Sequence, residues 1–178
     1  MMVIHSTKKA KTLLRKSGFF NDLRKKVSFE KDITIANELF HWHLNVTEKS
    51  EEQLLILTHD VSGVAVAIRV GESSTLKRLD SLLPLIIENV FLRAKCSRSF
   101  IDYYLEHSTH ITFSASREAK YISKNSFAGK HIKANKATID TDRLLQSHLT
   151  NNLNDMPRKS LEYKSPNQLL KTISQATC

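Results

Sequence analysis

The chain has 178 residues, 40% of them hydrophobic and 25% charged, which is the balance of one globular domain able to bury a core. No apolar run reaches the roughly 18 residues that a membrane-spanning helix needs, and its two cysteines, Cys96 and Cys178, exclude a disulfide framework. The apolar residues Met1 to Ile4 precede the first charges, the reverse of a secretory signal, so we expect a cytoplasmic protein with no membrane partner.

The net charge of +9 is sorted along the chain. Residues 1–33 carry nine Lys and Arg against three Asp and Glu, residues 34–106 carry seven against ten, and residues 107–178 carry eleven against five. If the basic head and the basic tail fold together, they focus a positive field on one surface. Such a field favours polyanion binding, so the charge indicates a class of partner but no reaction.

The first elements are predicted to be a strand and a basic helix. Residues 2–6 are typical of a short strand, and the Lys-rich segment after it has a cap in Ser6 or Thr7 and a stop in Gly18. Residues 19–33 are predicted to be an irregular connection.

The sheet is predicted to centre on residues 40–70. Apolar and polar residues alternate at its start, with Phe40, Trp42, Leu44 and Val46 on one side and His41, His43, Asn45 and Thr47 on the other. This period of two predicts a strand with one apolar and one polar face, and places the single tryptophan in the core. Residues 54–58 and 64–70 continue it as an antiparallel meander, with a loop at 48–52 and a tight turn at 60–63.

Helical spacing replaces this alternation after residue 75. The apolar residues from Leu76 to Phe91 recur at helical intervals, and Pro84 is expected to kink the helix or to restart it with Ser81 as the cap. The remaining predicted elements are helices at 98–107, from Ser116 to Gly129, at 139–153 and at 166–175, and a strand at 110–114.

The resulting fold class is α+β, a small and mostly antiparallel sheet of four or five strands packed against several helices. We expect a single domain over 1–178, with 138–178 as a candidate C-terminal helical extension.

Three segments together resemble an uncharacterised bacterial family, a domain of unknown function. They are the opening IHSTKKAKTLL, the strand pair FHWHLNV and LLILTHDVSGVAVAI, and the ending MPRKSLEYKSPNQLL. Members of that family begin with a His-x-Thr-Lys-Lys run and have a Trp-containing strand ending in Asn, where Asn45 stands here. The resemblance implies no established activity and therefore no functional residues.

The ending LNDMPRKSLEYKSPNQLL is also similar to the closing segment of some insertion-sequence transposases. The Asp/Asp/Glu catalytic core of those enzymes has no recognisable counterpart in this chain. The similarity therefore indicates a shared basic turn and helix, not transposition.

Histidines supply the only candidates for metal binding or catalysis. His41 and His43 share one strand face and His59 ends the neighbouring strand, so these three are the candidate metal ligands, although we predict no metal and no cofactor. His5, on the first strand, is the candidate acid–base residue of a nuclease-type site. Thr58, His59 and Asp60 cannot form a relay, because adjacent strand residues point to opposite faces.

The basic ends carry the stronger prediction. The candidate nucleic-acid contacts are Lys8, Lys9, Lys11, Arg15, Lys16, Arg117, Lys120, Lys124, Lys130, Arg158 and Lys159. Aromatic residues interleave with them, a pattern suited to phosphate contact and base stacking, although charge runs are more often a solvated surface. The leading hypothesis is a bacterial protein that binds RNA or DNA through both basic ends. The alternatives are a nuclease-type enzyme or toxin that uses His5, and a non-catalytic module that binds a protein partner.

Overall fold

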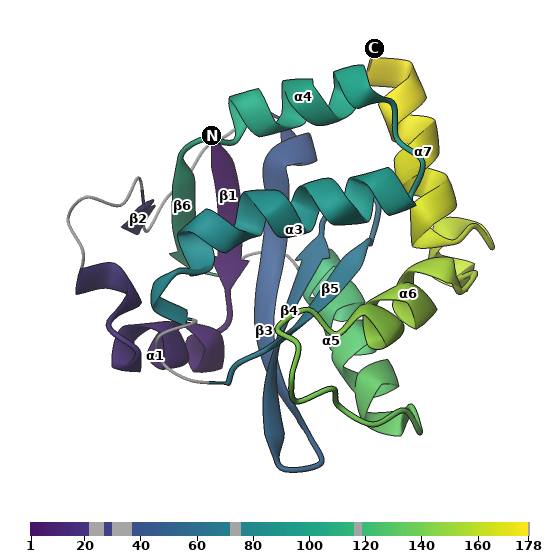
Figure 1. Cartoon of the computed structure of the whole chain (residues 1–178). Helices are drawn as coiled ribbons and strands as arrows, with labels where there is room; N and C mark the ends of the chain where they lie inside the picture. Colours follow the sequence, from purple (N-terminus) through teal and green to yellow (C-terminus); the bar gives the residue numbers. More distant parts are fainter. Residues whose placement is uncertain (22–26, 30–36, 72–75, 116–118, 178) are drawn as a thin grey trace.

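A six-stranded mixed sheet forms the centre of the protein (Figure 1). The computed structural model describes residues 1–178 except 22–26, 30–36, 72–75, 116–118 and 178. The strands are β1 (Met2–Ser6), β2 (Val27–Phe29), β3 (His41–Lys49), β4 (Glu52–His59), β5 (Ala65–Arg69) and β6 (Ile111–Ala115). Their order is β2-β6-β1-β3-β4-β5; the pairs from β2 to β3 are parallel, and those from β3 to β5 are antiparallel.

The described helices are α1 (Lys8–Lys16), α3 (Leu79–Arg93), α4 (Arg98–His107), α5 (Ala119–Ala134), α6 (Ser147–Asp155) and α7 (Pro166–Thr177). The α+β class is confirmed, but the small and mostly antiparallel sheet is wrong. The meander β3–β4–β5 is present as predicted, whereas β1 and β6 join it in parallel through helical crossovers, which leave no local sequence signal. β2 adds a sixth strand inside the segment expected to be irregular.

The two faces of the sheet are covered by different helices. Trp42 and Leu57 belong to the larger core, which α1, α3, α4 and α7 complete on one face. Leu54 and Ile56 belong to a smaller core with α5 and α6 on the other face. In Figure 1, α3 passes in front of the strands and α5 lies behind them. The central β1 is therefore buried over its whole length.

Three predicted helix features need correction. Pro84 lies inside one continuous α3, and Ser81, the expected cap, is in the first turn with its hydroxyl donating to the Arg78 carbonyl. Gly129 does not end α5 but lies within it, where a Cβ would come 3.8 Å from Thr47 and where the helix approaches β3 closely. The helix expected from residue 139 begins at Ser147, as α6.

The first basic helix is confirmed. Thr7 accepts a hydrogen bond from the Ala10 amide as the N-cap of α1, and Gly18, at a φ of +77°, ends the helix region. The α4 range agrees with the predicted one, and α7 begins at Pro166.

The edge strand β5 is closed by side chains of α6. The Asn154 amide accepts from the Ala65 N–H and donates to the Ala65 carbonyl, and Thr150 accepts from the Ala67 N–H. These bonds replace the strand partner that an open sheet edge would otherwise seek. The C-terminal segment therefore packs on the sheet along β5. In the described part of the chain, no helix is long and apolar enough to cross a membrane.

Candidate functional site

A row of polar side chains crosses the sheet on one face. Ser114 of β6 is opposite His5 of β1, His5 is opposite His43 of β3, and His43 is opposite Thr58 of β4. Directly opposite residues point to the same face, so the four form one lateral row. All four are at most 6% exposed. Burying this many hydrogen-bonding groups costs free energy unless they find partners, so the row is an unusual feature.

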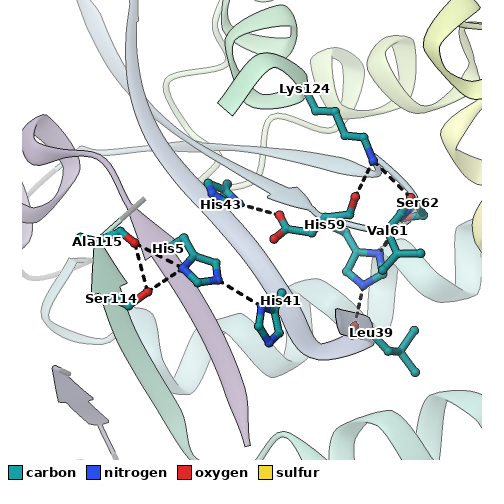
Figure 2. Close-up of polar contacts among 11 residues, drawn as sticks. His5, Leu39, His41, His43, His59, Val61, Ser62, Ser114, Ala115 and Lys124 are labelled. Atoms are coloured by element: carbon teal, nitrogen blue, oxygen red, sulfur yellow. Dashed lines mark hydrogen bonds and ion pairs between the residues drawn. The ribbon is translucent and has the colours of Figure 1, made fainter. Parts of the chain in front are cut away.

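His5 links this row to His41, which lies outside it at the start of β3 (Figure 2). Its Nδ1 lies 2.6 Å from the Ser114 hydroxyl oxygen, and its Nε2 lies 3.1 Å from Nδ1 of His41. Burial, followed by the charge of His43, lowers the pKa of His5 to about 4. His5 is therefore a neutral imidazole at neutral pH, able to act as a ligand or a proton acceptor.

Asp60 supplies the carboxylate of the site. Its backbone N–H donates to the His41 carbonyl at 3.0 Å, which fixes Asp60 beside the start of β3. Nδ1 of His43 donates to Asp60 Oδ1 at 2.6 Å, and both side chains are almost fully buried. Lys124 of α5 donates to the Asp60 and Val61 carbonyls, which ties the helix to this turn.

His59 does not join the other candidate metal ligands. It is opposite Trp42 in the register and so lies on the apolar face, away from His43. Its Nδ1 bonds the Ser62 hydroxyl at 2.8 Å and its Nε2 donates to the Leu39 carbonyl at 2.6 Å, so both ring nitrogens are occupied. Burial lowers its pKa to about 4. Asp60, rather than His59, lies near His41. The sequence could have indicated this, because the alternation that puts Thr58 on the polar face also puts Asp60 there if it is extended two residues further.

Trp42 is confirmed as a core residue. It is fully buried, and its indole N–H donates to the Tyr104 hydroxyl of α4 at 2.7 Å.

Three lysines of α1 line a cavity of about 470 Å³ between the helix and the β3–β4 pair. Its lining residues are Lys8, Lys9, Thr12, Leu13, Lys16, Val46 and Gln53. Lys8, Lys9, Arg15 and Lys16 are exposed, and Lys11 is half-buried. The expected catalytic residue His5 is not among the residues that line this cavity.

Glu48 of β3 joins the two basic ends of the chain. Lys9 donates to its carboxylate at 2.6 Å and, with a further contribution from Lys133 of α5, holds the pKa of Glu48 below its usual range. β1 and β6 are neighbours and run parallel, so the chain leaves both at the same edge of the sheet before α1 and α5. The basic head and part of the basic tail therefore both act on Glu48, although α1 and α5 pack on opposite faces of the sheet.

The other predicted basic contacts are distributed differently. Lys130 and Lys159 are exposed, whereas Lys124 is occupied by backbone carbonyls. Arg117 and the side chain of Lys120 lie outside the described residues.

Arg158 is buried, which contradicts its predicted role on a binding surface. Its guanidinium donates to the Gly63 and Leu153 carbonyls at 3.3 and 2.8 Å and lies over the Phe127 ring, 4.9 Å from its centre. Burial lowers its pKa to about 10. Arg158 thus serves the interior, where the turn before α7 folds back over the β4–β5 turn, whereas Phe127 stays 41% exposed.

We expect Arg158→Met to lower the free energy of unfolding by about 2–4 kcal/mol, because it leaves two buried carbonyls without a donor. Urea denaturation followed by circular dichroism measures this cost. The exposed Lys171→Met removes the same charge and should leave stability within about 0.5 kcal/mol of the parent. Equal stability of the two variants would contradict the structural role of Arg158.

The fold and the site define a mixed α/β protein with a buried polar row on one face of the sheet and a lysine-lined cavity on the other face. A family model for a domain of unknown function, DUF6933, matches residues 3–169, and the chain belongs to this family. Neither the curated proteins nor the solved structures contain a significant match.

Proposed function

We propose that this protein binds nucleic acid, RNA or DNA, in the cavity between α1 and the β3–β4 pair. The observation that carries the proposal is the lining of that cavity by three lysines. Their ammonium groups suit phosphate oxygens, and the Thr12 hydroxyl and the Gln53 amide add polar contacts. Leu13 and Val46 supply an apolar wall against which a base or a sugar can pack.

The charge around the cavity supports the same proposal. The described acidic side chain beside the lysines, Glu48, is already paired with Lys9, so a phosphate that replaces it at Lys9 exchanges one anion for another. Lys133 of α5 adds positive charge near Glu48. The net charge of +9 supplies the long-range attraction that speeds encounter with a polyanion.

Neutralising the cavity lysines should weaken binding and its dependence on salt. For the parent, the logarithm of the affinity for single strands is expected to fall linearly with the logarithm of salt concentration, by about 0.7 for each phosphate neutralised. The triple variant Lys8→Gln, Lys9→Gln, Lys16→Gln should lower that slope by about 2. Fluorescence anisotropy with labelled RNA and DNA strands over a salt series measures both quantities.

A control of equal charge separates a site from general attraction. Arg93, Lys95 and Lys171 are exposed and lie outside the cavity lining, so the triple substitution of these residues by Gln removes the same charge. It should retain most of the parent's slope. Equal losses of affinity and salt slope in the two triple variants would contradict the cavity as the binding site. Absence of salt-sensitive binding to both RNA and DNA would contradict the proposal and favour a protein partner.

A further inference from the structure

We propose that the polar face of the sheet holds a site for one divalent transition-metal ion, bound by His5, His41 and Asp60. One ring nitrogen of each histidine and one carboxylate oxygen all lie within 4.8 Å of one another. The three residues come from β1, the start of β3 and the turn after β4, which are adjacent in the sheet. This site is separate from the proposed nucleic-acid cavity and does not depend on it.

The spacing of the two histidine nitrogens already suits a shared ion. His5 Nε2 and His41 Nδ1 are 3.1 Å apart. Two imidazoles bound to one tetrahedral zinc ion have nitrogens about 3.3 Å apart, given metal–nitrogen bonds of about 2.0–2.1 Å. Asp60 places a carboxylate oxygen within 4.8 Å of both nitrogens, so binding an ion asks for a side-chain adjustment of Asp60 alone.

Asp60 has an oxygen available for such an ion. Oδ1 accepts from His43, whereas Oδ2 is buried and has no hydrogen-bond donor among the described residues. The residue is only 1% exposed, so solvent does not readily replace that donor. A buried carboxylate oxygen without a partner is costly, and a cation would compensate it.

The groups that orient metal ligands are also present. Ligating histidines usually bond a second group through their other nitrogen, and Nδ1 of His5 has the Ser114 hydroxyl at 2.6 Å and the Ala115 carbonyl at 3.4 Å. With hydrogen on that Nδ1, the Nε2 lone pair of His5 can bind the ion, and His41 offers Nδ1 as well once its own hydrogen moves to Nε2, with no net loss of a proton. His43 holds the Asp60 carboxylate in the same way. His41 is only half-buried and gives the ion a route from solvent.

The donor set indicates the kind of ion. Two neutral imidazoles and one carboxylate suit zinc, ferrous iron, cobalt or manganese, whereas calcium and magnesium prefer sites made of oxygen alone. Three protein ligands leave coordination positions for water or another small ligand.

Cobalt(II) and zinc(II) titrations of tag-free, chelator-treated protein test the site. The parent should bind one equivalent of cobalt with the visible absorption of a low-symmetry site, and zinc should raise its melting temperature. His41→Ala should weaken binding by at least about a hundredfold, because it removes a direct ligand. Asp60→Asn, which keeps the shape but not the charge, should weaken it as well.

Controls distinguish a true site from scattered histidines and from unfolding. His148→Ala removes an exposed histidine of α6 and should bind cobalt like the parent. Circular dichroism in chelator shows whether each variant folds. If Asp60→Asn does not fold, His41→Ala decides the test, because His41 is half-exposed and its removal disturbs the interior less. Cobalt affinity of His41→Ala equal to that of the parent, or no stoichiometric binding by the parent, would overturn the proposal.

Discussion

Acidification from pH 6.5 to 4 is expected to lower the free energy of unfolding by on the order of 5 kcal/mol, from His5 and His59 together. Burial lowers the pKa of each to about 4 in the folded protein, against 6.5 in the unfolded chain. Below pH 6.5 the unfolded chain therefore takes up protons that the folded protein does not. The stabilisation is complete above pH 6.5 and is lost as the pH falls towards 4. Urea denaturation at a series of pH values, in chelator, measures the effect.

The charged and titratable neighbours of both histidines bear on this profile. His43, Asp60 and His41 act on His5, whereas Asp60, Lys124 and His41 act on His59. His5→Asn should remove about half of the fall in stability with pH, whatever it does to stability at neutral pH. The exposed His148→Asn should leave the slope unchanged. A parent slope between pH 6.5 and 5 no steeper than that of His5→Asn would contradict the burial of a neutral His5.

His43→Leu is expected to lower the free energy of unfolding by about 3–5 kcal/mol, because it takes the only described donor from a buried carboxylate. Adding Asp60→Asn to that variant should recover at least about 1 kcal/mol, since an amide is cheaper to bury than an unpaired charge. A double-mutant cycle by urea denaturation gives the coupling.

The neighbouring row position supplies the control for this cycle. The Thr58 hydroxyl is buried without a hydrogen-bond partner in the described part of the chain, so Thr58→Val should cost less than about 1 kcal/mol or stabilise. Additive losses from His43 and Asp60 would show that the two residues do not act as a pair.

Local patterns in the sequence predicted the meander and the first basic helix. The alternation around Trp42 fixed which residues of β3 face the core, and Thr7 with Gly18 marked the ends of α1. These features depend on neighbours along the chain. The parallel placement of β1 between β6 and β3 depends on residues more than thirty positions apart, for which a single sequence carries no signal.

The sequence predicted the residue types of the site but not their arrangement, because the arrangement depends on pairing between distant strands. His5, His41 and His43 were singled out by residue type, but their assembly needed the register between β1 and β3. His59 was placed with them because it ends the neighbouring strand, although its position next to Thr58 puts it on the opposite face. Arg158 was predicted to be a surface charge because it lies in a basic run of the sequence. Its burial comes from the turn that folds back and places the guanidinium over the Phe127 ring, and a local sequence pattern does not reveal that contact.

The most direct test of the nucleic-acid proposal is an amide NMR titration of the protein with a short single-stranded oligonucleotide. We expect the shifted resonances to gather on α1, around Val46 to Gln53 and at the end of α5 near Lys133, since these segments surround the cavity and Glu48. The shifts should disappear in the Lys8, Lys9 and Lys16 triple variant and persist in its equal-charge control. Shifts that gather instead on α3 and α4, or that persist in the triple variant, would contradict the proposal.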